Sequence, residues 1–356
     1  MIRFLHGADF HLDSAFAALP PEKAALRRRE QRQILERLAR LCQGCDLIFL
    51  SGDLFDSAHI YRDTLEALKR CFSAISGQIF IAPGNHDCVL SGSPYLTEPW
   101  GDHVHIFTKN QIECIHLENP KCDVYGAGFI SSESPDLLKG FHVINPSVPN
   151  FMVLHGDLQT DSCYCPITRA EVEASSLDYL ALGHIHKPFS EKIGRTLCVY
   201  PGCLMGRGFD ECGEKGIFCG ELAASGCQAE FLPVPSWKYE ILTLPAGQDP
   251  LASILNALPG DCSRDSYRIV LTGEAEDIRL PELETALDGR FFSLSLQDHT
   301  YHRRDLWEHS GENTLRGNFL REMQTRYQAA GEEERLKIVR AVRLVTALMD
   351  GREVSL

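Results

Sequence analysis

Seven residues that could bind metal ions occur along the chain in five short strings. They are Asp9, His11, Asp53, Asn85, His155, His184 and His186. None of the strings contains a cysteine, so the donors are carboxylate, amide and imidazole groups. Such donors suit a pair of Mn²⁺, Fe or Zn ions, and paired ions catalyse the attack of water on a phosphate ester. The residue types therefore predict a dinuclear hydrolytic centre.

Each string comes directly after an apolar stretch that we interpret as a buried strand. These strands are expected at 2–8, 46–50, 78–82, 151–155 and 179–183. Helices predicted at 21–43 and 61–75 separate the first three strands. Such alternation is typical of an open α/β sheet, which presents reactive residues at the carboxyl ends of its strands. Further strands are predicted at 104–107, 112–116, 122–129, 197–200 and 216–221, and a helix at 168–176.

The rest of the chain is predicted to form two smaller parts, because 356 residues is long for one domain. Leu232-Pro233-Val234-Pro235 is the candidate linker, since its prolines interrupt helices and strand ladders. After it we expect strands at 267–271 and 291–296, a helix at 281–288, and terminal helices at 315–328 and 332–349. The predicted division is a main domain at 1–235, a small α+β cap at 236–310 and a helical segment at 311–356.

The composition is that of a globular protein without a membrane span. Hydrophobic residues make up 44% of the chain and charged residues 24%, and no window approaches 18 consecutive apolar residues. The first residues lack the apolar region of a signal peptide, so we expect a cytoplasmic protein with no membrane partner. The 14 cysteines are scattered, and in that compartment we expect reduced thiols.

The net charge of −14 is unfavourable for binding nucleic acid, because affinity for the phosphate backbone depends on lysine and arginine. The charge is unevenly distributed, however. Residues 21–43 carry seven basic and three acidic side chains, whereas residues 238–300 carry five basic and eleven acidic ones. If DNA binds, we therefore expect it near the first long helix and the metal ligands, away from the acidic region.

The five strings resemble those of the calcineurin-like metallophosphoesterases in spelling and order. They read Asp9-Phe10-His11, Gly52-Asp53-Leu54-Phe55-Asp56, Gly84-Asn85-His86-Asp87, His155-Gly156-Asp157 and Gly183-His184-Ile185-His186. The resemblance implies an α/β fold, a two-layer αββα sandwich, with the cap and the C-terminal helices attached. It also implies how two divalent ions are held, with Asp53 as the bridging carboxylate. One ion would bind Asp9, His11, Asp53 and His186, and the other Asp53, Asn85, His155 and His184.

Two further residues are implied as catalytic. In the family, the histidine that matches His86 orients the scissile phosphate and protonates the leaving oxygen, which an imidazole can do near neutral pH. Asp56 lies three residues after Asp53, where related phosphatases carry an acid that pairs with this histidine. We therefore predict that the side chains of Asp56 and His86 pair beside the metal ions.

The resemblance is most specific to the SbcD-type DNA-repair nucleases. It rests on the segments Ala181–Pro188, Tyr200–Cys203 and Gly206–Gly216. It implies a Mn²⁺-dependent exonuclease and single-strand endonuclease that dimerises and works beside a coiled-coil, SbcC-type ATPase. The chain departs from that pattern at Leu12-Asp13-Ser14, where the nucleases usually have Leu-Gly, and at Cys203, which replaces a common serine. These departures bear on which substrate is cleaved, and they leave the predicted chemistry of the metal ions unchanged.

Two alternatives use the same metal ligands. One is a phosphodiesterase or phosphatase for small molecules or proteins, because one fold supports many substrates. The other is a scaffold subunit that regulates an ATPase and has weak nuclease activity. A coiled-coil ATPase encoded beside the gene would favour the repair complex, whereas neighbouring genes of signalling or nucleotide salvage would favour the small-molecule enzyme. The terminal helices could dock an ATPase or pack on the chain's own surface.

Overall fold

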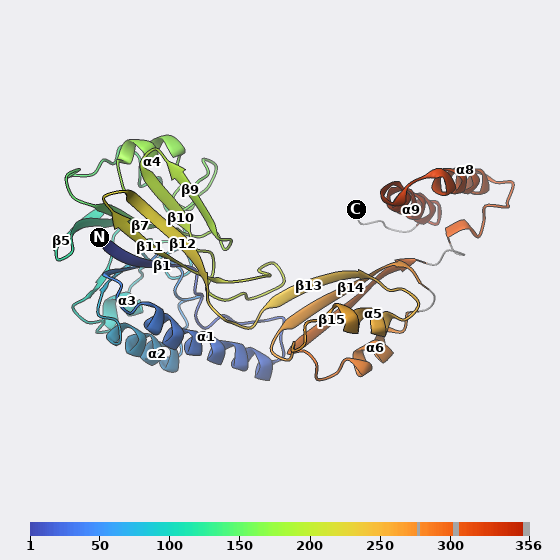
Figure 1. The fold of residues 1–356 in the computed structure, drawn as a ribbon, viewed down its shortest axis with the longest axis horizontal. Helices are drawn as coiled ribbons and strands as arrows, with labels where there is room; N and C mark the ends of the chain where they lie inside the picture. Colours follow the sequence, from blue (N-terminus) through green and yellow to red (C-terminus); the bar gives the residue numbers. More distant parts are fainter. Residues whose placement is uncertain (276–277, 302–305, 352–356) are drawn as a thin grey trace. The chain divides into compact units, whose positions relative to one another are not determined.

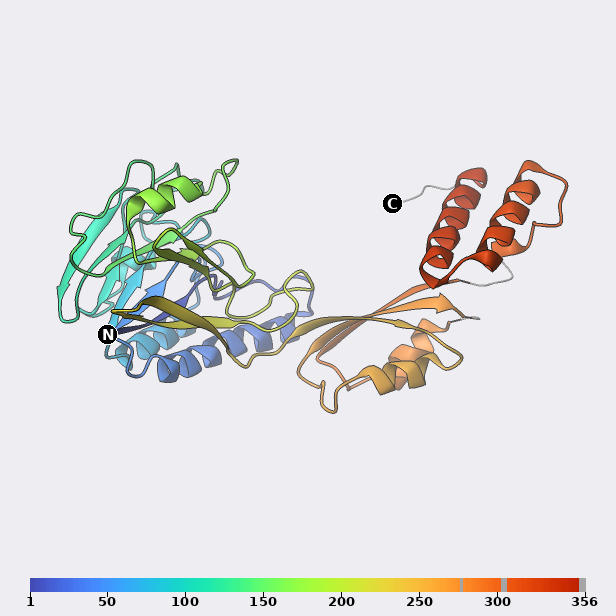
Figure 2. The ribbon, with the colours of Figure 1, turned by 45° about the horizontal axis from the view of Figure 1, so that its top comes forward.

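The structure is a computed structural model that describes residues 1–275, 278–301 and 306–351. Contacts divide the chain into two compact units, Met1–Tyr239 and Glu240–Leu356, which Figures 1 and 2 show as ribbons. The predicted domain boundaries at 235 and 310 stay a prediction. Parts of the predicted cap (276–277 and 302–305) and of the predicted tail (352–356) lie outside the described residues.

The first sheet of Met1–Tyr239 has six strands in the order β12-β11-β1-β2-β3-β4. Their bounds are β1 Ile2–Gly7, β2 Leu47–Leu50, β3 Gln78–Ile81, β4 Val104–Ile106, β11 Gly216–Ala223 and β12 Gly226–Pro233. Strands β1 to β4 pair in parallel, and β11 pairs antiparallel with β1. Helices α1 (Pro21–Leu41) and α2 (Arg62–Ser73) connect the first three strands, and the short α3 (Pro94–Thr97) follows β3. The predicted alternation of strand and helix is confirmed here.

The second sheet also has six strands, in the order β5-β6-β7-β8-β10-β9. Their bounds are β5 Glu113–Glu118, β6 Lys121–Gly126, β7 Asn150–His155, β8 Tyr179–Gly183, β9 Phe189–Ile193 and β10 Thr196–Tyr200. The four central strands are parallel, and β5 and β9 are antiparallel edges. Helix α4 (Arg169–Ser175) lies between β7 and β8 in the sequence and begins with a capping box formed by Thr168 and Glu171.

The two sheets pack face to face between layers of helices. Aromatic side chains fill the space between the sheets: Phe4 of β1 lies 4.4 Å from Tyr179 of β8, ring centroid to ring centroid. The other face of the first sheet packs on α1 and α2, and the other face of the second packs on α4. Figure 1 shows α1 and α2 on one side of the sheets and α4 on the other. The αββα architecture predicted from the sequence is confirmed.

Sequence reasoning missed the two edge strands β9 and β12, because they are polar and only partly buried. For the same reason, the predicted linker is wrong in its first half. Leu232 and Pro233 end β12, where they pair with Ile217 and Gly216 of β11. A proline is tolerated at this position because an edge strand leaves one side of its backbone unpaired.

The unit Glu240–Leu356 contains a three-stranded sheet in the order β13-β14-β15, of which β13 begins at Tyr239. The bounds are β13 Tyr239–Pro245, α5 Pro250–Ala257, β14 Ser266–Glu274, α6 Leu280–Ala286 and β15 Ser293–Tyr301. One apolar core joins this sheet to α5 and α6. A second core joins α8 (Leu315–Ala329) to α9 (Glu332–Met349). The sequence did not predict β13 and α5. No helix in the described ranges has the length and apolar character needed to cross a membrane.

Candidate metal centre

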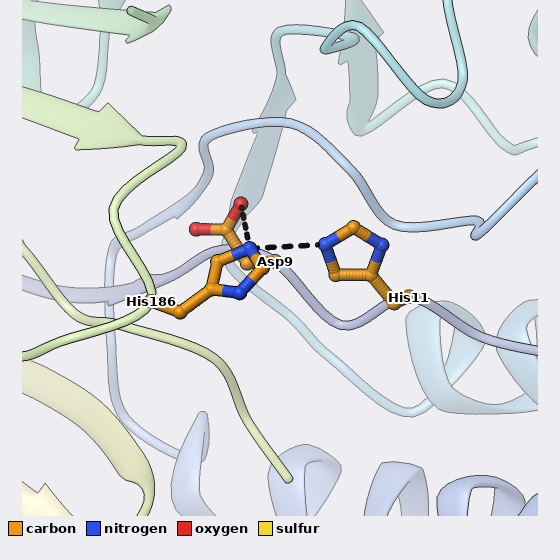
Figure 3. A group of neighbouring side chains, drawn as sticks. All are labelled: Asp9, His11 and His186. Carbon is orange, nitrogen blue, oxygen red and sulfur yellow. Dashed lines mark hydrogen bonds and ion pairs between the residues drawn. The ribbon is translucent and has the colours of Figure 1, made fainter. Parts of the chain in front are cut away.

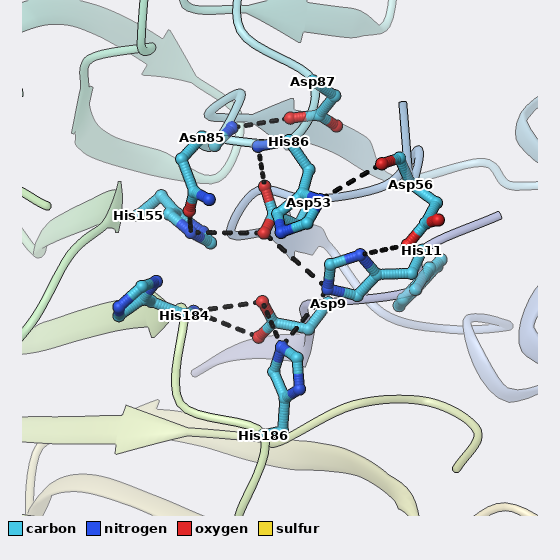
Figure 4. A network of polar contacts seen from close by, with 12 residues as sticks. Asp9, His11, Asp53, Asp56, Asn85, His86, Asp87, His155, His184 and His186 are labelled. Carbon is cyan, nitrogen blue, oxygen red and sulfur yellow. Dashed lines mark hydrogen bonds and ion pairs between the residues drawn. The ribbon is translucent and has the colours of Figure 1, made fainter. Parts of the chain in front are cut away.

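All seven predicted ligands lie at or just beyond the carboxyl ends of parallel strands. Asp9 and His11 follow β1, Asp53 follows β2 and Asn85 follows β3, while His155 ends β7 and His184 and His186 follow β8. The two sheets are joined at this edge, because the backbone N–H of His184 donates to both carboxylate oxygens of Asp9 at 3.1 Å. Figure 4 shows the ligands of both sheets gathered in one site.

The backbone at these strand ends is strained. Four of the predicted ligands have φ in the left-handed region: Asp9 (53°), His11 (44°), Asp53 (50°) and His184 (104°). Each such residue costs of the order of 1–3 kcal/mol and persists only where the surroundings hold it. Two hydrogen bonds hold the first turn: Asp9 N donates to Gly52 O at 3.1 Å, and His11 N donates to Asp53 O at 2.9 Å. Strain of this kind is typical of functional sites.

Glycines allow the ligand-bearing loops to approach one another closely. A Cβ atom on Gly183 would lie 1.8 Å from the carbonyl oxygen of Ser51. A Cβ atom on Gly84 would lie 2.3 Å from Oδ1 of Asp53. Both separations are shorter than any contact between non-bonded atoms. The glycines in the Gly-Asp, Gly-Asn-His-Asp and Gly-His-Ile-His strings are therefore required by the space between the loops.

The carboxylate of Asp53 lies between the two groups of predicted ligands (Figure 4). Its Oδ2 atom is 3.7 Å from Nε2 of His11 and 3.5 Å from Nε2 of His155. Its Oδ1 atom accepts a hydrogen bond from the backbone N–H of His86 at 2.9 Å. Asp53 is thus the side chain placed to reach both ions, as the family resemblance implies.

Two histidines point their Nε2 atoms at each other (Figure 3), and these atoms of His11 and His186 lie 3.2 Å apart. The Nδ1 atom of His11 is 3.1 Å from Oδ1 of Asp56, and that of His186 is 2.7 Å from Oε1 of Glu211. Because a carboxylate can only accept, Nδ1 of His11 carries the proton. Nδ1 of His186 also lies 3.2 Å from Nη2 of Arg207, which can only donate, but the Glu211 oxygen is closer, so we assign the proton to Nδ1 there as well. Two Nε2 lone pairs then face one another. That arrangement is repulsive by itself and favourable when a cation lies between them.

The same pattern recurs on the other side of Asp53. His155 donates from Nδ1 to the carbonyl oxygen of Ser51 at 3.0 Å, so its Nε2 atom is an acceptor. That atom lies 2.9 Å from Oδ1 of Asn85, which is also an acceptor. Two acceptors therefore converge here as well.

His184 is placed differently from the other ligands. Its ring centroid is 5.2 Å from that of His155 and 4.7 Å from that of Tyr164. Its ring nitrogens belong to none of the three donor clusters in the described part of the chain. These clusters are Asp9, His11 and His186; His11, Asp53 and His86; and Asp9, Asp53 and His155. The structure thus connects six predicted ligands through a continuous series of contacts and leaves the His184 ring at their margin.

Burial controls the charge of the centre. It raises the pKa of Asp9 well above its usual value, and the neighbouring Asp53 raises it further. Burial also raises the pKa of Asp53. It lowers the pKa of His11, His155 and His184 to about 4, so these imidazoles are neutral near pH 7. Burial therefore disfavours the charge on both carboxylates, a penalty that a bound cation would offset, while the imidazoles are already in the neutral form that binds metal.

The donor set fits divalent ions. Within each cluster the ligand atoms lie within 4.8 Å of one another. Two nitrogens bound to one ion at about 2.1 Å would be roughly 3.0–3.4 Å apart for angles of 90° to 109° at the ion. The 3.2 Å between His11 and His186 falls in that range. Oxygen and imidazole donors without thiolate suit Mn²⁺, Fe or Zn, and which of these is native stays a prediction.

The predicted pairing of the Asp56 and His86 side chains is wrong. The carboxylate of Asp56 bonds to His11 and to Arg207, whose Nη1 atom lies 2.9 Å from Oδ1. His86 instead contacts the backbone carbonyl oxygen of Asp56, 3.1 Å from its Nδ1 atom. The Asp56 carboxylate is thus occupied by Nδ1 of His11 and Nη1 of Arg207 and does not pair with His86. The catalytic role predicted for Asp56 stays untested, and the contact makes it a support for His11.

Three residues of the site had no role assigned from the sequence: Asp87, Arg207 and Glu211. Asp87 accepts from the backbone N–H groups of Gly84 and Leu54, both at 2.7 Å, and so joins the loops after β2 and β3. Arg207 and Glu211 lie behind His11 and His186. All three occur within strings or segments that carry the family resemblance. Their position in these segments was the only indication of a role that the sequence offered, because their contacts form only in the tertiary structure.

A four-layer α/β fold with carboxylate, amide and imidazole donors at its strand ends defines the class of metal-dependent phosphoesterases. The chain belongs to the calcineurin-like phosphoesterase superfamily, whose domain model matches residues 2–218. The resemblance seen in the sequence is confirmed at this level. Residues 2–218 therefore form a metallophosphoesterase domain, in a family of phosphoester hydrolases that use divalent metal ions.

The similar proteins do not identify the substrate. The uncharacterized metallophosphoesterase YhaO of Bacillus subtilis (strain 168) is 28% identical over 247 residues, which are 65% of this chain and 60% of YhaO. The match thus spans less than two thirds of that relative. TT1561 of Thermus thermophilus is 13% identical, covers 65% of this chain and 98% of its own, and has a TM-score of 0.39. A novel archaeal phosphodiesterase is 12% identical, with coverages of 65% and 100% and a TM-score of 0.36.

Proposed function

We propose that this chain is a Mn²⁺-dependent DNA nuclease of the SbcD type, an exonuclease and endonuclease that acts in DNA repair. The observation that carries the hydrolytic part is the position of Asp53, whose Oδ2 atom lies between His11 and His155. The DNA substrate is supported by the resemblance of the segments Ala181–Pro188 and Gly206–Gly216 to those nucleases.

Each residue of the centre has a task that its contacts define. When bound, two divalent ions supply the positive charge that attracts a phosphodiester and make water a better nucleophile. His11, His155 and His186 carry their proton on Nδ1, so their Nε2 atoms would hold the ions. Asp53 provides the carboxylate between the two groups.

His86 is placed to act on the substrate. Its ring is exposed, unlike those of His11 and His155. Because its Nδ1 atom donates to the carbonyl oxygen of Asp56, Nε2 is the atom left for the substrate. In the imidazolium form of His86 both ring nitrogens carry a proton. The proton on Nε2 can then hydrogen-bond to the scissile phosphate and pass to the leaving oxygen, which leaves a neutral ring with its proton on Nδ1. Proton transfer of this kind contributes typically 10²- to 10⁴-fold to the rate.

Exposed arginines of α1 are the proposed DNA contacts. Arg29 and Arg40 are exposed and line a groove of about 710 Å³ between α1 and α2, together with Arg70. Arg27 is excluded from this role, because it is 1% exposed and donates to Glu30 at 2.6 Å and to the carbonyl oxygen of Gly206 at 2.8 Å. Arg27 is one of the seven basic residues counted in 21–43, and its hydrogen bond attaches α1 to the segment around Gly206.

Two further proposals concern partners. The resemblance supports a homodimer formed through the nuclease domain, and a coiled-coil SbcC-type ATPase as the second subunit. Helices α8 and α9 are candidates for contacting the ATPase, because Leu315, Leu336 and Leu348 are exposed on them by 78%, 52% and 59%. An amphipathic helix that leaves apolar side chains exposed is suited to a groove of a partner.

Hydrolysis by the purified full chain with Mn²⁺ tests the proposal. The substrates are end-labelled single- and double-stranded DNA and bis-p-nitrophenyl phosphate. We expect DNA cleavage by the wild type and a loss of about 100-fold or more in His86→Ala, with Mn²⁺ still bound. His142→Ala is the matched control, because His142 is also exposed and its Nδ1 atom also contacts a backbone carbonyl oxygen, that of Ala174.

The other outcomes identify the alternatives. Turnover of the small diester with intact DNA would mean a working metal site with another substrate class, or a missing ATPase. DNA that stays intact after the ATPase is added would contradict the nuclease and favour a phosphodiesterase or phosphatase for small molecules or proteins. Bound Mn²⁺ without turnover of either substrate would favour a regulatory scaffold subunit, and adding the ATPase would show whether a partner restores the activity.

A further inference from the structure

We propose that Arg207 is a positioning residue that orients two ligands of one metal ion at once, His11 and His186. The inference rests on the proposed metal centre and concerns a residue for which neither the family match nor the relatives supply a role. Arg207 follows β10 in the segment Gly206–Gly216, far in sequence from His11. Its guanidinium group reaches both imidazole rings through two carboxylates, and its Nη2 atom also lies 3.2 Å from Nδ1 of His186.

The first connection passes through Asp56. Arg207 donates from Nη1 to Oδ1 of Asp56 at 2.9 Å. The same oxygen accepts from Nδ1 of His11 at 3.1 Å. Asp56 lies on the loop after β2 with 24% of its side chain exposed, and the arginine adds a charged donor that helps to fix its carboxylate. A fixed carboxylate holds the plane and the tautomer of the His11 ring.

The second connection passes through Glu211. Arg207 donates from Nη2 to Oε1 of Glu211 at 2.9 Å, and its backbone N–H donates to Oε2 at 2.8 Å. The Oε1 atom also accepts from Nδ1 of His186 at 2.7 Å. The side chain of Glu211 is 5% exposed, so water is a poor substitute for these donors. Glu211 therefore holds His186 as Asp56 holds His11.

Only a planar group with several donors can make both connections. The Nη1 and Nη2 atoms of one guanidinium diverge toward two different carboxylates, and the group keeps its charge at any pH at which the protein is folded. A lysine would offer a single ammonium at one point. The consequence lies at the front of the rings, where the two Nε2 atoms are 3.2 Å apart (Figure 3). Their separation and direction depend on the shared arginine.

The role differs from that of a residue that binds substrate. Both Nη atoms are occupied by carboxylates, and the Arg207 side chain is 23% exposed. A positioning role predicts weaker metal binding in the absence of substrate. A substrate contact would instead raise KM and leave metal binding unchanged.

Mn²⁺ binding to the full chain tests the inference. The variants are Arg207→Gln, Arg207→Lys and Glu211→Gln, and bound Mn²⁺ is measured by electron paramagnetic resonance and by elemental analysis. We expect the wild type to bind two ions and both arginine variants to bind one of them about 10- to 100-fold more weakly. Glu211→Gln should lose less, because its amide oxygen still accepts from His186. Far-ultraviolet circular dichroism shows whether each variant is folded.

Arg169→Gln is the matched control. Arg169 also makes a two-point ion pair, with Glu191 at 3.2 and 2.8 Å, but on the exposed surface beside α4. It should bind Mn²⁺ like the wild type. If folded Arg207→Lys and Arg207→Gln bind two Mn²⁺ with unchanged affinity, Arg207 does not position the ligands. If the wild type itself binds no Mn²⁺, the proposed metal centre and this inference both fail.

Discussion

The carboxylate of Asp87 should contribute more to stability than any other single acid of the site. It is 7% exposed and accepts four hydrogen bonds. Its Oδ2 atom accepts from Leu54 N at 2.7 Å, Phe55 N at 3.2 Å and the Tyr95 hydroxyl at 2.6 Å, while Oδ1 accepts from Gly84 N at 2.7 Å. These donors lie on three segments of the chain. Asp87 thus holds the loop after β2 against the loop after β3.

The magnitude follows from the donors that each substitution leaves unpaired. A buried donor without a partner costs about 1–3 kcal/mol. Asp87→Ala leaves four hydrogen-bond donors without an acceptor, so we expect a loss of at least about 4 kcal/mol in the free energy of unfolding. Asp87→Asn keeps one oxygen for Leu54 and Tyr95 and turns its amide toward Gly84, at a cost of roughly 2 kcal/mol. Tyr95→Phe removes one donor and its hydrogen bond, at about 1.5 kcal/mol.

Equilibrium unfolding in urea measures this series. The experiment is done at pH 8, because burial and the nearby Asp53 raise the pKa of Asp87 to about 6 and the carboxylate must be ionised. Glu118→Ala is the control, since that side chain is 86% exposed and should change stability by less than about 0.5 kcal/mol. If Asp87→Ala costs no more than Tyr95→Phe, the carboxylate does not join the loops as we argue.

Two more predictions follow from buried polar groups. Asp13 has φ of 65° and accepts from Tyr61 N at 2.8 Å and from the Thr64 hydroxyl at 2.6 Å. Asp13→Gly and Asp13→Ala should both destabilise the chain, with the glycine variant about 1 kcal/mol more stable because it adopts positive φ freely; equal urea midpoints would contradict this. His6, between Tyr179 and Ser51, has its pKa lowered by burial to about 3. Unfolded His6 binds its proton near pH 6.5, so from pH 6.5 down to pH 3 its contribution to stability falls by about 1.4 kcal/mol per unit. His6→Gln should remove that part of the pH dependence, and an unchanged slope between pH 5 and pH 6 would refute the argument.

The departure at Asp13 shows what local sequence can and cannot explain. The related nucleases usually have glycine after the leucine, and here φ at this position is positive. An aspartate occupies it because its carboxylate is bound by the start of α2, at Tyr61 and Thr64. No pattern near residue 13 predicts a contact with residue 64. The contacts of Asp13 with Tyr61 and Thr64 therefore give the substitution a structural explanation.

The sequence by itself determined which residues face the centre. In each string a polar residue follows closely after an apolar strand. Parallel strands present their carboxyl ends at one edge of a sheet, so Asp9, Asp53 and Asn85 could be assigned to one site from the first sheet alone. These are local properties, set by periodicity and by backbone conformation.

Only the tertiary structure decided how the side chains are paired. Asp56 was expected to bond to His86, yet its carboxylate bonds to Arg207, a residue 151 positions away in the sequence. Glu211 holds His186, and the edge strand β12 takes up half of the expected linker. Each of these contacts depends on which donor or strand edge lies nearest after folding. Sequence spacing does not record that distance, because the free energy of a hydrogen bond depends on separation in space and on burial.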